Sequence, residues 1–137
     1  MPDRIAVTAL GFDYGTRRIG VAVGQTVSGT AEALVTIAVH NGRPDWDAIA
    51  RVIAEWRPQQ LVLGRPERDD DGVHGLSATI ERFARRLHGR FGLPVAFVDE
   101  RLSSYAAQDD PAVASRGLDA AAARLILESW LALARGD

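Results

Sequence analysis

Residues 10–24 have the sequence LGFDYGTRRIGVAVG, and this stretch predicts the first two strands of the protein's β-sheet. It contains the end of an apolar run, residues 5–12, and a second apolar run, residues 19–24. Two short apolar runs joined by a glycine-containing connection predict a β-hairpin. Asp13 ends the first run, where a buried carboxylate is costly unless a positive charge compensates it.

Two further acidic residues stand at comparable borders. Glu100 follows a strand-like run, residues 94–98, and Asp119 opens a predicted helix over residues 119–134. Together with Asp13, these carboxylates lie at the edges of core elements. Carboxylate oxygens are the ligands that Mg²⁺ and Mn²⁺ prefer, so the pattern indicates a divalent-metal site.

The composition is that of an ordinary globular protein. The 137 residues, of which 47% are hydrophobic and 25% charged, suit one domain, and we expect residues 1–137 to form it. The absence of cysteine excludes disulfides, thiolate zinc sites and a cysteine nucleophile. The sequence has no apolar stretch long enough to span a bilayer and no signal-type segment, so we expect a cytoplasmic protein.

The charge pattern bears on nucleic-acid binding. The net charge of −2 argues against indiscriminate binding to a phosphate backbone, although a locally basic groove stays possible. All sixteen basic residues are arginine, because the sequence contains no lysine. Any side chain that binds phosphate through a fixed positive charge must therefore be an arginine.

The remaining pattern predicts an α/β protein. The predicted order is βββαβαβα, which favours a five-stranded mixed sheet flanked by helices. A helix is expected to begin after Asp45 as its N-cap and to end before Pro58, and a short helix is expected near Ser103. The other expected segments are strands over 33–39, 60–64 and 94–98, a turn over 41–44 and a helix over 76–91.

Three motifs carry a family resemblance. They are the stretch 10–24, the sequence DERLSS at 99–104 and the sequence DAAAARLILES at 119–129. With these motifs the chain resembles the YqgF family, also called RuvX, within the ribonuclease H-like fold. The family was first described as Holliday junction resolvases and is now mostly regarded as pre-16S rRNA nucleases. The resemblance covers nearly the whole chain, but the segment 106–117 looks shorter and less basic than in relatives.

The resemblance implies a metal-dependent nuclease with Asp13, Glu100 and Asp119 as catalytic residues and metal ligands. Hydrolysis of a phosphodiester needs an activated water and a stabilised leaving oxygen, which two Mg²⁺ or Mn²⁺ ions about 4 Å apart supply. We expect Asp13 to bridge the two ions. Taken singly, each acid has another interpretation: Asp13 as a turn residue, Asp119 as a helix N-cap and Glu100 as a solvated acid or an arginine partner.

Three arginines lie beside these acids in the sequence. We predict that Arg17, Arg18 and Arg101 contact substrate phosphates. The alternative is that they are surface residues or partners of acids, which applies to Arg18 above all. The arginines of the segment 76–91 are interpreted as a solvated helix face.

Several functions stay open at this point. Cleavage of RNA, in particular at the 5′ end of pre-16S rRNA, comes first by resemblance. Resolution of a four-way DNA junction is the alternative and would need a homodimer with two active sites. A non-catalytic nucleic-acid-binding module on the same fold is a further alternative. The run 12–16 also resembles a phosphate-binding motif of sugar kinases, but those enzymes close two domains over ATP.

Overall fold

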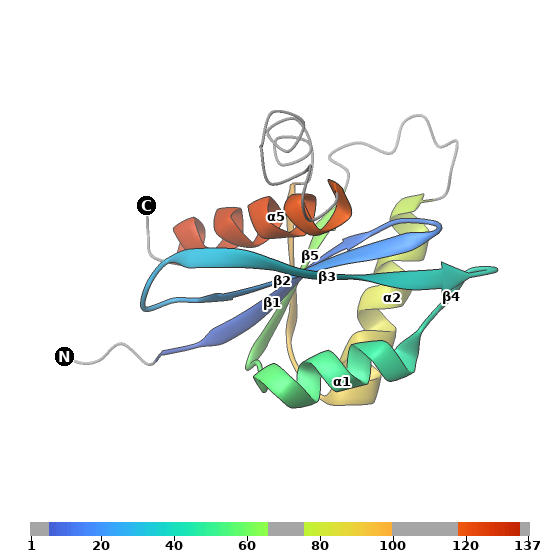
Figure 1. Cartoon of the computed structure of the whole chain (residues 1–137), viewed down its shortest axis with the longest axis horizontal. Coiled ribbons are helices and arrows are strands. Elements are labelled where there is room, and N and C mark those ends of the chain that lie inside the picture. Colours follow the sequence, from blue (N-terminus) through green and yellow to red (C-terminus); the bar gives the residue numbers. More distant parts are fainter. Residues whose placement is uncertain (1–5, 66–75, 100–117, 135–137) are drawn as a thin grey trace.

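The computed structural model describes residues 6–65, 76–99 and 118–134 of the chain, and its elements alternate around one sheet (Figure 1). The strands are β1 (Thr8–Tyr14), β2 (Arg18–Gln25), β3 (Thr30–His40), β4 (Arg43–Pro44), β5 (Gln60–Arg65) and β6 (Val95–Asp99). The helices are α1 (Trp46–Trp56), α2 (Leu76–Phe91) and α5 (Leu118–Ala134). None of these helices is long and apolar enough to cross a membrane.

The sheet is mixed, as the sequence predicts. Its strand order is β4-β3-β2-β1-β5-β6, with β1 antiparallel to β2 and parallel to β5. The predicted hairpin is therefore confirmed, and its register pairs Asp13 with Gly20. Asp13 lies inside β1, one residue before its end, rather than after it. Because β1, β5 and β6 are parallel, their carboxyl ends meet at one edge of the sheet.

The predicted strand number of five is wrong by one within the described residues, because β4 adds a sixth. The segment 41–44 was expected to be a turn only. Asn41 and Gly42 have φ values of 53° and 76°, so they form the tight turn themselves. The chain then pairs back, with Pro44 opposite Val39. Proline lacks an N–H group and is tolerated here because β4 is an edge strand.

The predicted helix after Asp45 is confirmed. The Asp45 carboxylate accepts a hydrogen bond from the Ala48 N–H at 3.1 Å, as an N-cap does. At the other end, Arg57 adopts a left-handed conformation and its N–H donates to the Ile53 carbonyl. The short helix predicted near Ser103 lies outside the described residues.

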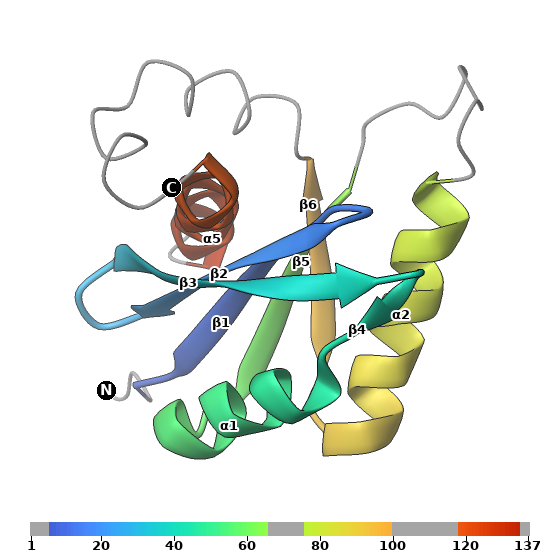
Figure 2. The same cartoon turned by 45° about the vertical axis from the view of Figure 1, so that its right-hand side comes forward.

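The two faces of the sheet differ in side-chain size. Helices α1 and α2 cover one face and α5 covers the other (Figures 1 and 2). Large residues of β1 such as Leu10 and Phe12 point toward α1 and α2, whereas Ala9 and, on β2, Ala22 point toward α5. Small side chains let α5 lie close to the sheet, and this closeness positions the residues described next.

Candidate active site

Asp13 lies on the α5 side of the sheet. Successive residues of a strand alternate between the faces, so Asp13 shares the face of Ala9, which packs in the core beneath α5. Its neighbours Phe12 and Tyr14 belong to the core on the opposite face. Asp13 is half-buried.

Asp119 reaches the same position from the other end of the chain. It is the second residue of α5, and its main chain passes directly over Gly20. A Cβ atom built on Gly20 would lie 1.8 Å from the Asp119 carbonyl oxygen. Because Gly20 is the ladder partner of Asp13, with Cα atoms about 5 Å apart in such pairs, both acids flank one point of the sheet. Two residues far apart in the sequence thus lie beside one point of the sheet.

Arg18 pairs with Asp119. The Arg18 Nε donates to Asp119 Oδ2 at 2.8 Å, and the two side chains are 62% and 29% exposed. The sequence left two roles open for Arg18, and the structure shows it as the partner of an acid. The pair shows that the Asp119 carboxylate already attracts a cation.

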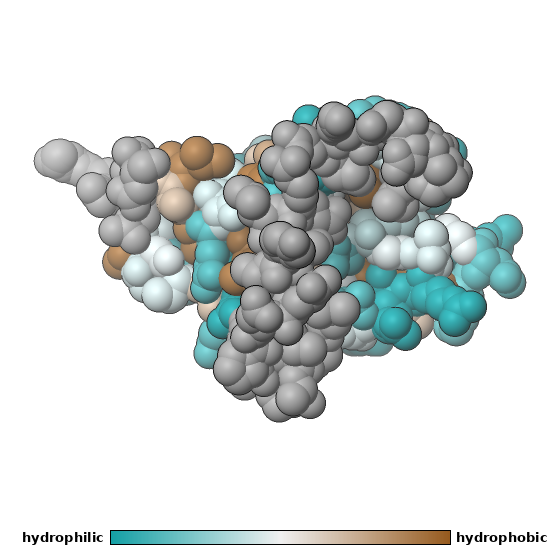
Figure 3. Space-filling model, turned by 90° about the horizontal axis from the view of Figure 1, so that it is seen from above, coloured by the Kyte–Doolittle hydropathy of each residue, from teal (hydrophilic) through white to brown (hydrophobic). Residues whose placement is uncertain are grey.

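Arg17 lies one residue before β2 and is exposed. Its carbonyl oxygen accepts a hydrogen bond from the Val39 N–H at 2.9 Å, which fixes the backbone between the hairpin and β3. Hydrophilic residues gather at the end of the molecule that carries the β1–β2 hairpin and β4 (Figures 1 and 3). This end therefore presents a polar surface beside Asp13.

The third predicted acid is not described. Glu100 and Arg101 lie outside the described residues, immediately after β6. The strand register gives the position of the end of β6 relative to β1. Phe12 of β1 is the register partner of Leu63 in β5, and Leu63 is the register partner of Phe97 in β6. With neighbouring strands about 4.8 Å apart, the end of β6 lies roughly 10 Å from Asp13. Asp99, the last residue of β6, is exposed at this same edge.

The donor chemistry of the site fits a hard divalent cation. Asp13 and Asp119 supply only oxygen atoms, which Mg²⁺ and Mn²⁺ prefer, and a cationic group already contacts Asp119. Within residues 6–65, 76–99 and 118–134, no group of three or more acidic or histidine side chains could hold a metal ion.

Gly20 is not among the site residues predicted from the sequence. A glycine within a strand often marks the close approach of another backbone, and this signal could have identified Gly20. Tyr14 packs against Phe83, with ring centroids 4.9 Å apart, and is only 7% exposed, so it does not offer its ring to a base. Burial raises the pKa of the Tyr14 hydroxyl, and Arg82 and Arg86 oppose part of this rise.

The family assignment follows from the length of the sequence match. The family model described as "RuvX: Holliday junction resolvase" matches residues 7–133. The chain belongs to the RuvX family. The resemblance inferred from the three motifs is thereby confirmed.

Similar members of the RuvX family carry the name "Putative pre-16S rRNA nuclease". The protein from Azotobacter vinelandii is 48% identical over 130 residues, covering 90% of this chain and 92% of its own length. A protein from Pseudomonas aeruginosa is also 48% identical over 130 residues, with 90% of each chain covered. The Nitrosococcus oceani protein is 44% identical over 128 residues, covering 89% of this chain and 84% of its own length.

Solved structures similar to this RuvX-family chain include RuvC of Thermus thermophilus in complex with a Holliday junction substrate. The TM-score is 0.64 at 15% identity, and 95% of this chain and 96% of that chain are covered. A second T. thermophilus RuvC structure gives a TM-score of 0.52 at 13% identity, with 94% and 96% covered. At these identities the likeness shows the fold, and it confirms the predicted ribonuclease H-like class.

Proposed function

We propose that this protein is a divalent-metal-dependent nuclease that hydrolyses phosphodiester bonds in RNA, with the 5′ end of pre-16S rRNA as its substrate. The convergence of Asp13 and Asp119 across Gly20 carries the proposal. The names of relatives that are 48% identical support the substrate. An activity on ribosomal RNA precursors would place the protein in the cytoplasm.

We assign the third carboxylate of the site to Glu100. In the sequence, Glu100 comes directly after β6, the strand parallel to β5. Together with Asp13 and Asp119 it would provide three carboxylates, which suit two Mg²⁺ or Mn²⁺ ions with Asp13 as the shared ligand. Such ions would activate a water and stabilise the leaving oxygen when bound.

The arginines next to the acids have different tasks in this proposal. Arg18 holds the Asp119 carboxylate in place and lowers the negative charge of the site. Arg17, which is exposed at the end of the hairpin, and Arg101 are assigned to substrate phosphates, which guanidinium groups bind through paired hydrogen bonds. These contacts would orient the scissile phosphate toward Asp13.

Cleavage of a labelled pre-16S rRNA 5′ leader tests this function. The wild-type protein should cut it with Mn²⁺ or Mg²⁺ and not with EDTA, and Glu100→Gln should lose at least about a hundredfold in rate, because even outer partners of metal ligands are typically worth 10- to 100-fold. Unchanged cleavage by Glu100→Gln would remove Glu100 from the site. Equal cleavage in EDTA would exclude metal dependence.

A second candidate function is Holliday junction resolution, which the description of the family model favours. Two opposed strands of a junction must be cut, so this function would require a homodimer with two active sites. Gel filtration with and without a four-way DNA junction, together with a cleavage assay on that junction, separates the two candidates. A monomer that cuts only RNA contradicts resolution.

A further inference from the structure

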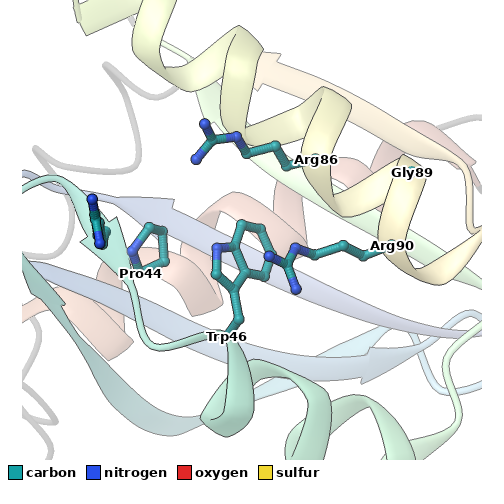
Figure 4. Close-up of a pocket in the computed structure, with 6 residues that line it drawn as sticks. Pro44, Trp46, Arg86, Gly89 and Arg90 are labelled. Atoms are coloured by element: carbon teal, nitrogen blue, oxygen red, sulfur yellow. The ribbon is translucent and has the colours of Figure 1, made fainter.

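A cavity of about 590 Å³ lies on the face of the sheet opposite α5. Its walls come from α2, β4 and the first residue of α1, and Arg86 and Arg90 reach across it toward Pro44 and Trp46 (Figure 4). The Arg90 guanidinium lies 4.2 Å from the centroid of the Trp46 ring, a cation–π contact that fixes its position. The full lining is Arg43, Pro44, Trp46, Arg86, Gly89 and Arg90.

A second, smaller cleft extends this cavity toward the active-site end of the sheet. Its walls include Tyr14, Arg82 and Phe83, and it shares Pro44 and Arg86 with the first cavity. The two form one depression, which we call the arginine groove, with Arg43, Arg82, Arg86 and Arg90 as its cations.

The charge of the arginine groove is not balanced by acids within the described part of the chain. No aspartate or glutamate from that part lines either cavity, and the ion pairs found there involve Arg18 and Arg65 instead. Arg82, Arg86 and Arg90 follow one another at four-residue intervals on α2, about 6 Å apart along the helix axis. This is a row of positive charges suited to a ligand with repeated negative charges.

The groove begins directly behind the active site. Tyr14 lines it, and the adjacent residue Asp13 belongs to the opposite face of the sheet. A polymer that passes over the end of the β1–β2 hairpin would reach from one face to the other, past the exposed Arg17.

We propose that the arginine groove binds the phosphate backbone of single-stranded RNA that flanks the bond to be cut. This rests on the proposed nuclease function, since it adds a second contact region for the same substrate. Because the groove binds phosphates, it raises the affinity for RNA and orients the RNA without recognising its base sequence. It also explains how a chain with a net charge of −2 binds a polyanion, because four of its sixteen arginines line this one groove.

Binding of a fluorescent 15-nucleotide RNA in EDTA, followed by anisotropy over a salt series, tests the proposal without cleavage. The double variant Arg82→Gln/Arg86→Gln should raise Kd about tenfold and lower the salt slope by about 1.4, at roughly 0.7 per phosphate contact. The control is Arg51→Gln/Arg85→Gln, which removes the same charge from exposed positions outside the groove and should change Kd less than twofold. Circular dichroism establishes that both variants are folded.

Three outcomes contradict the groove. Unchanged binding by Arg82→Gln/Arg86→Gln is the first, and equal weakening by both double variants, which indicates only net charge, is the second. The third is displacement of the RNA by micromolar uridine monophosphate, which would make the cavity a mononucleotide pocket.

A small substrate separates this inference from the nuclease function. Bis(p-nitrophenyl) phosphate contains one phosphodiester and is too short to span the sheet edge. With Mn²⁺, the groove variant should hydrolyse it at the wild-type rate, whereas Asp13→Asn should not hydrolyse it. If Asp13→Asn is as active as wild type, the proposed site fails while the anisotropy result stands by itself. If the groove variant loses this activity, its defect is not one of RNA binding and the groove proposal fails.

Discussion

The main chain of Asp119 lies against Gly20 so closely that no side chain fits between them: a Cβ on Gly20 would approach the Asp119 carbonyl oxygen to 1.8 Å. This contact ties the start of α5 to the strand pair that carries Asp13. The spacing of the two acids therefore depends on a residue without a functional group.

Gly20→Ala should disrupt the site without touching an acid. The added methyl group must push α5 from the sheet, so we expect a loss of about 1–3 kcal/mol in the free energy of unfolding, as for other overpacked positions. The rate of RNA cleavage should also fall, because the displaced helix moves Asp119 away from Asp13. Denaturant unfolding and the RNA cleavage assay measure the two effects. Gly89→Ala is the control for the unfolding measurement alone, because Gly89 lines the arginine groove: its Cβ meets nothing within 4 Å, and in a helix it should add about 0.5–1 kcal/mol to the free energy of unfolding. Wild-type activity and stability of Gly20→Ala would show that the contact does not position Asp119.

Arg18→Gln should tighten Mn²⁺ binding. The Arg18 guanidinium occupies one oxygen of Asp119, so a metal ion competes with it for that carboxylate. The pair is largely exposed and such pairs are worth about 0–1 kcal/mol, so the gain in affinity should be at most about fivefold. Calorimetric titration with Mn²⁺ measures it. A weaker Mn²⁺ affinity in Arg18→Gln would mean that Arg18 supports the metal site rather than competing with it.

The Tyr14 hydroxyl should titrate above its ordinary pKa of about 10, because burial disfavours the phenolate. Arg82 and Arg86 hold the pKa down, so Arg82→Gln/Arg86→Gln should raise it further. The protein has two tyrosines, and a Tyr105→Phe background leaves Tyr14 alone for titration by absorbance at 295 nm. An unchanged Tyr14 pKa in the double variant would show that these arginines do not act on the hydroxyl.

The same shift predicts a loss of stability at high pH. Above pH 10 the unfolded chain releases the tyrosine proton before the folded chain does, so the free energy of unfolding falls as pH rises through the folded-state pKa. Tyr14→Phe should remove this part of the pH dependence. An identical decline in Tyr14→Phe between neutral pH and pH 11 would assign it to other groups.

The sheet was predictable because its signals are local. The apolar runs of β1 and β2 and the N-cap at Asp45 each appear within a few residues of sequence, and all three are confirmed. The strand β4 is not predicted because a strand of two residues is too short to show an alternation of apolar and polar side chains. Its pairing with β3 depends on the left-handed turn at Asn41 and Gly42, which reverses the chain.

The site was less predictable because its contacts are long-range. The three motifs predict which acids form the site, and the main chain of Asp119 lies over Gly20, the ladder partner of Asp13. The catalytic role of these acids stays a prediction. The pairing of Arg18 with Asp119 could not be chosen from sequence, since a surface arginine beside a motif suits a phosphate equally well. The sequence predicts a solvated face for the arginines of α2, because periodicity shows which face of a helix is polar but not that β4 lies opposite this face and forms a groove with it.

The most direct test of a single site built across Gly20 is a double-mutant cycle of Asp13→Asn and Asp119→Asn on Mn²⁺-dependent RNA cleavage, with the exposed Asp47→Asn as control. Groups that act as one unit give non-additive losses. Each single variant should lose at least about a hundredfold, the double variant should be no worse than the more damaging single one, and Asp47→Asn should match wild type. Losses that multiply in the double variant, or wild-type cleavage by either single variant, would contradict a shared site.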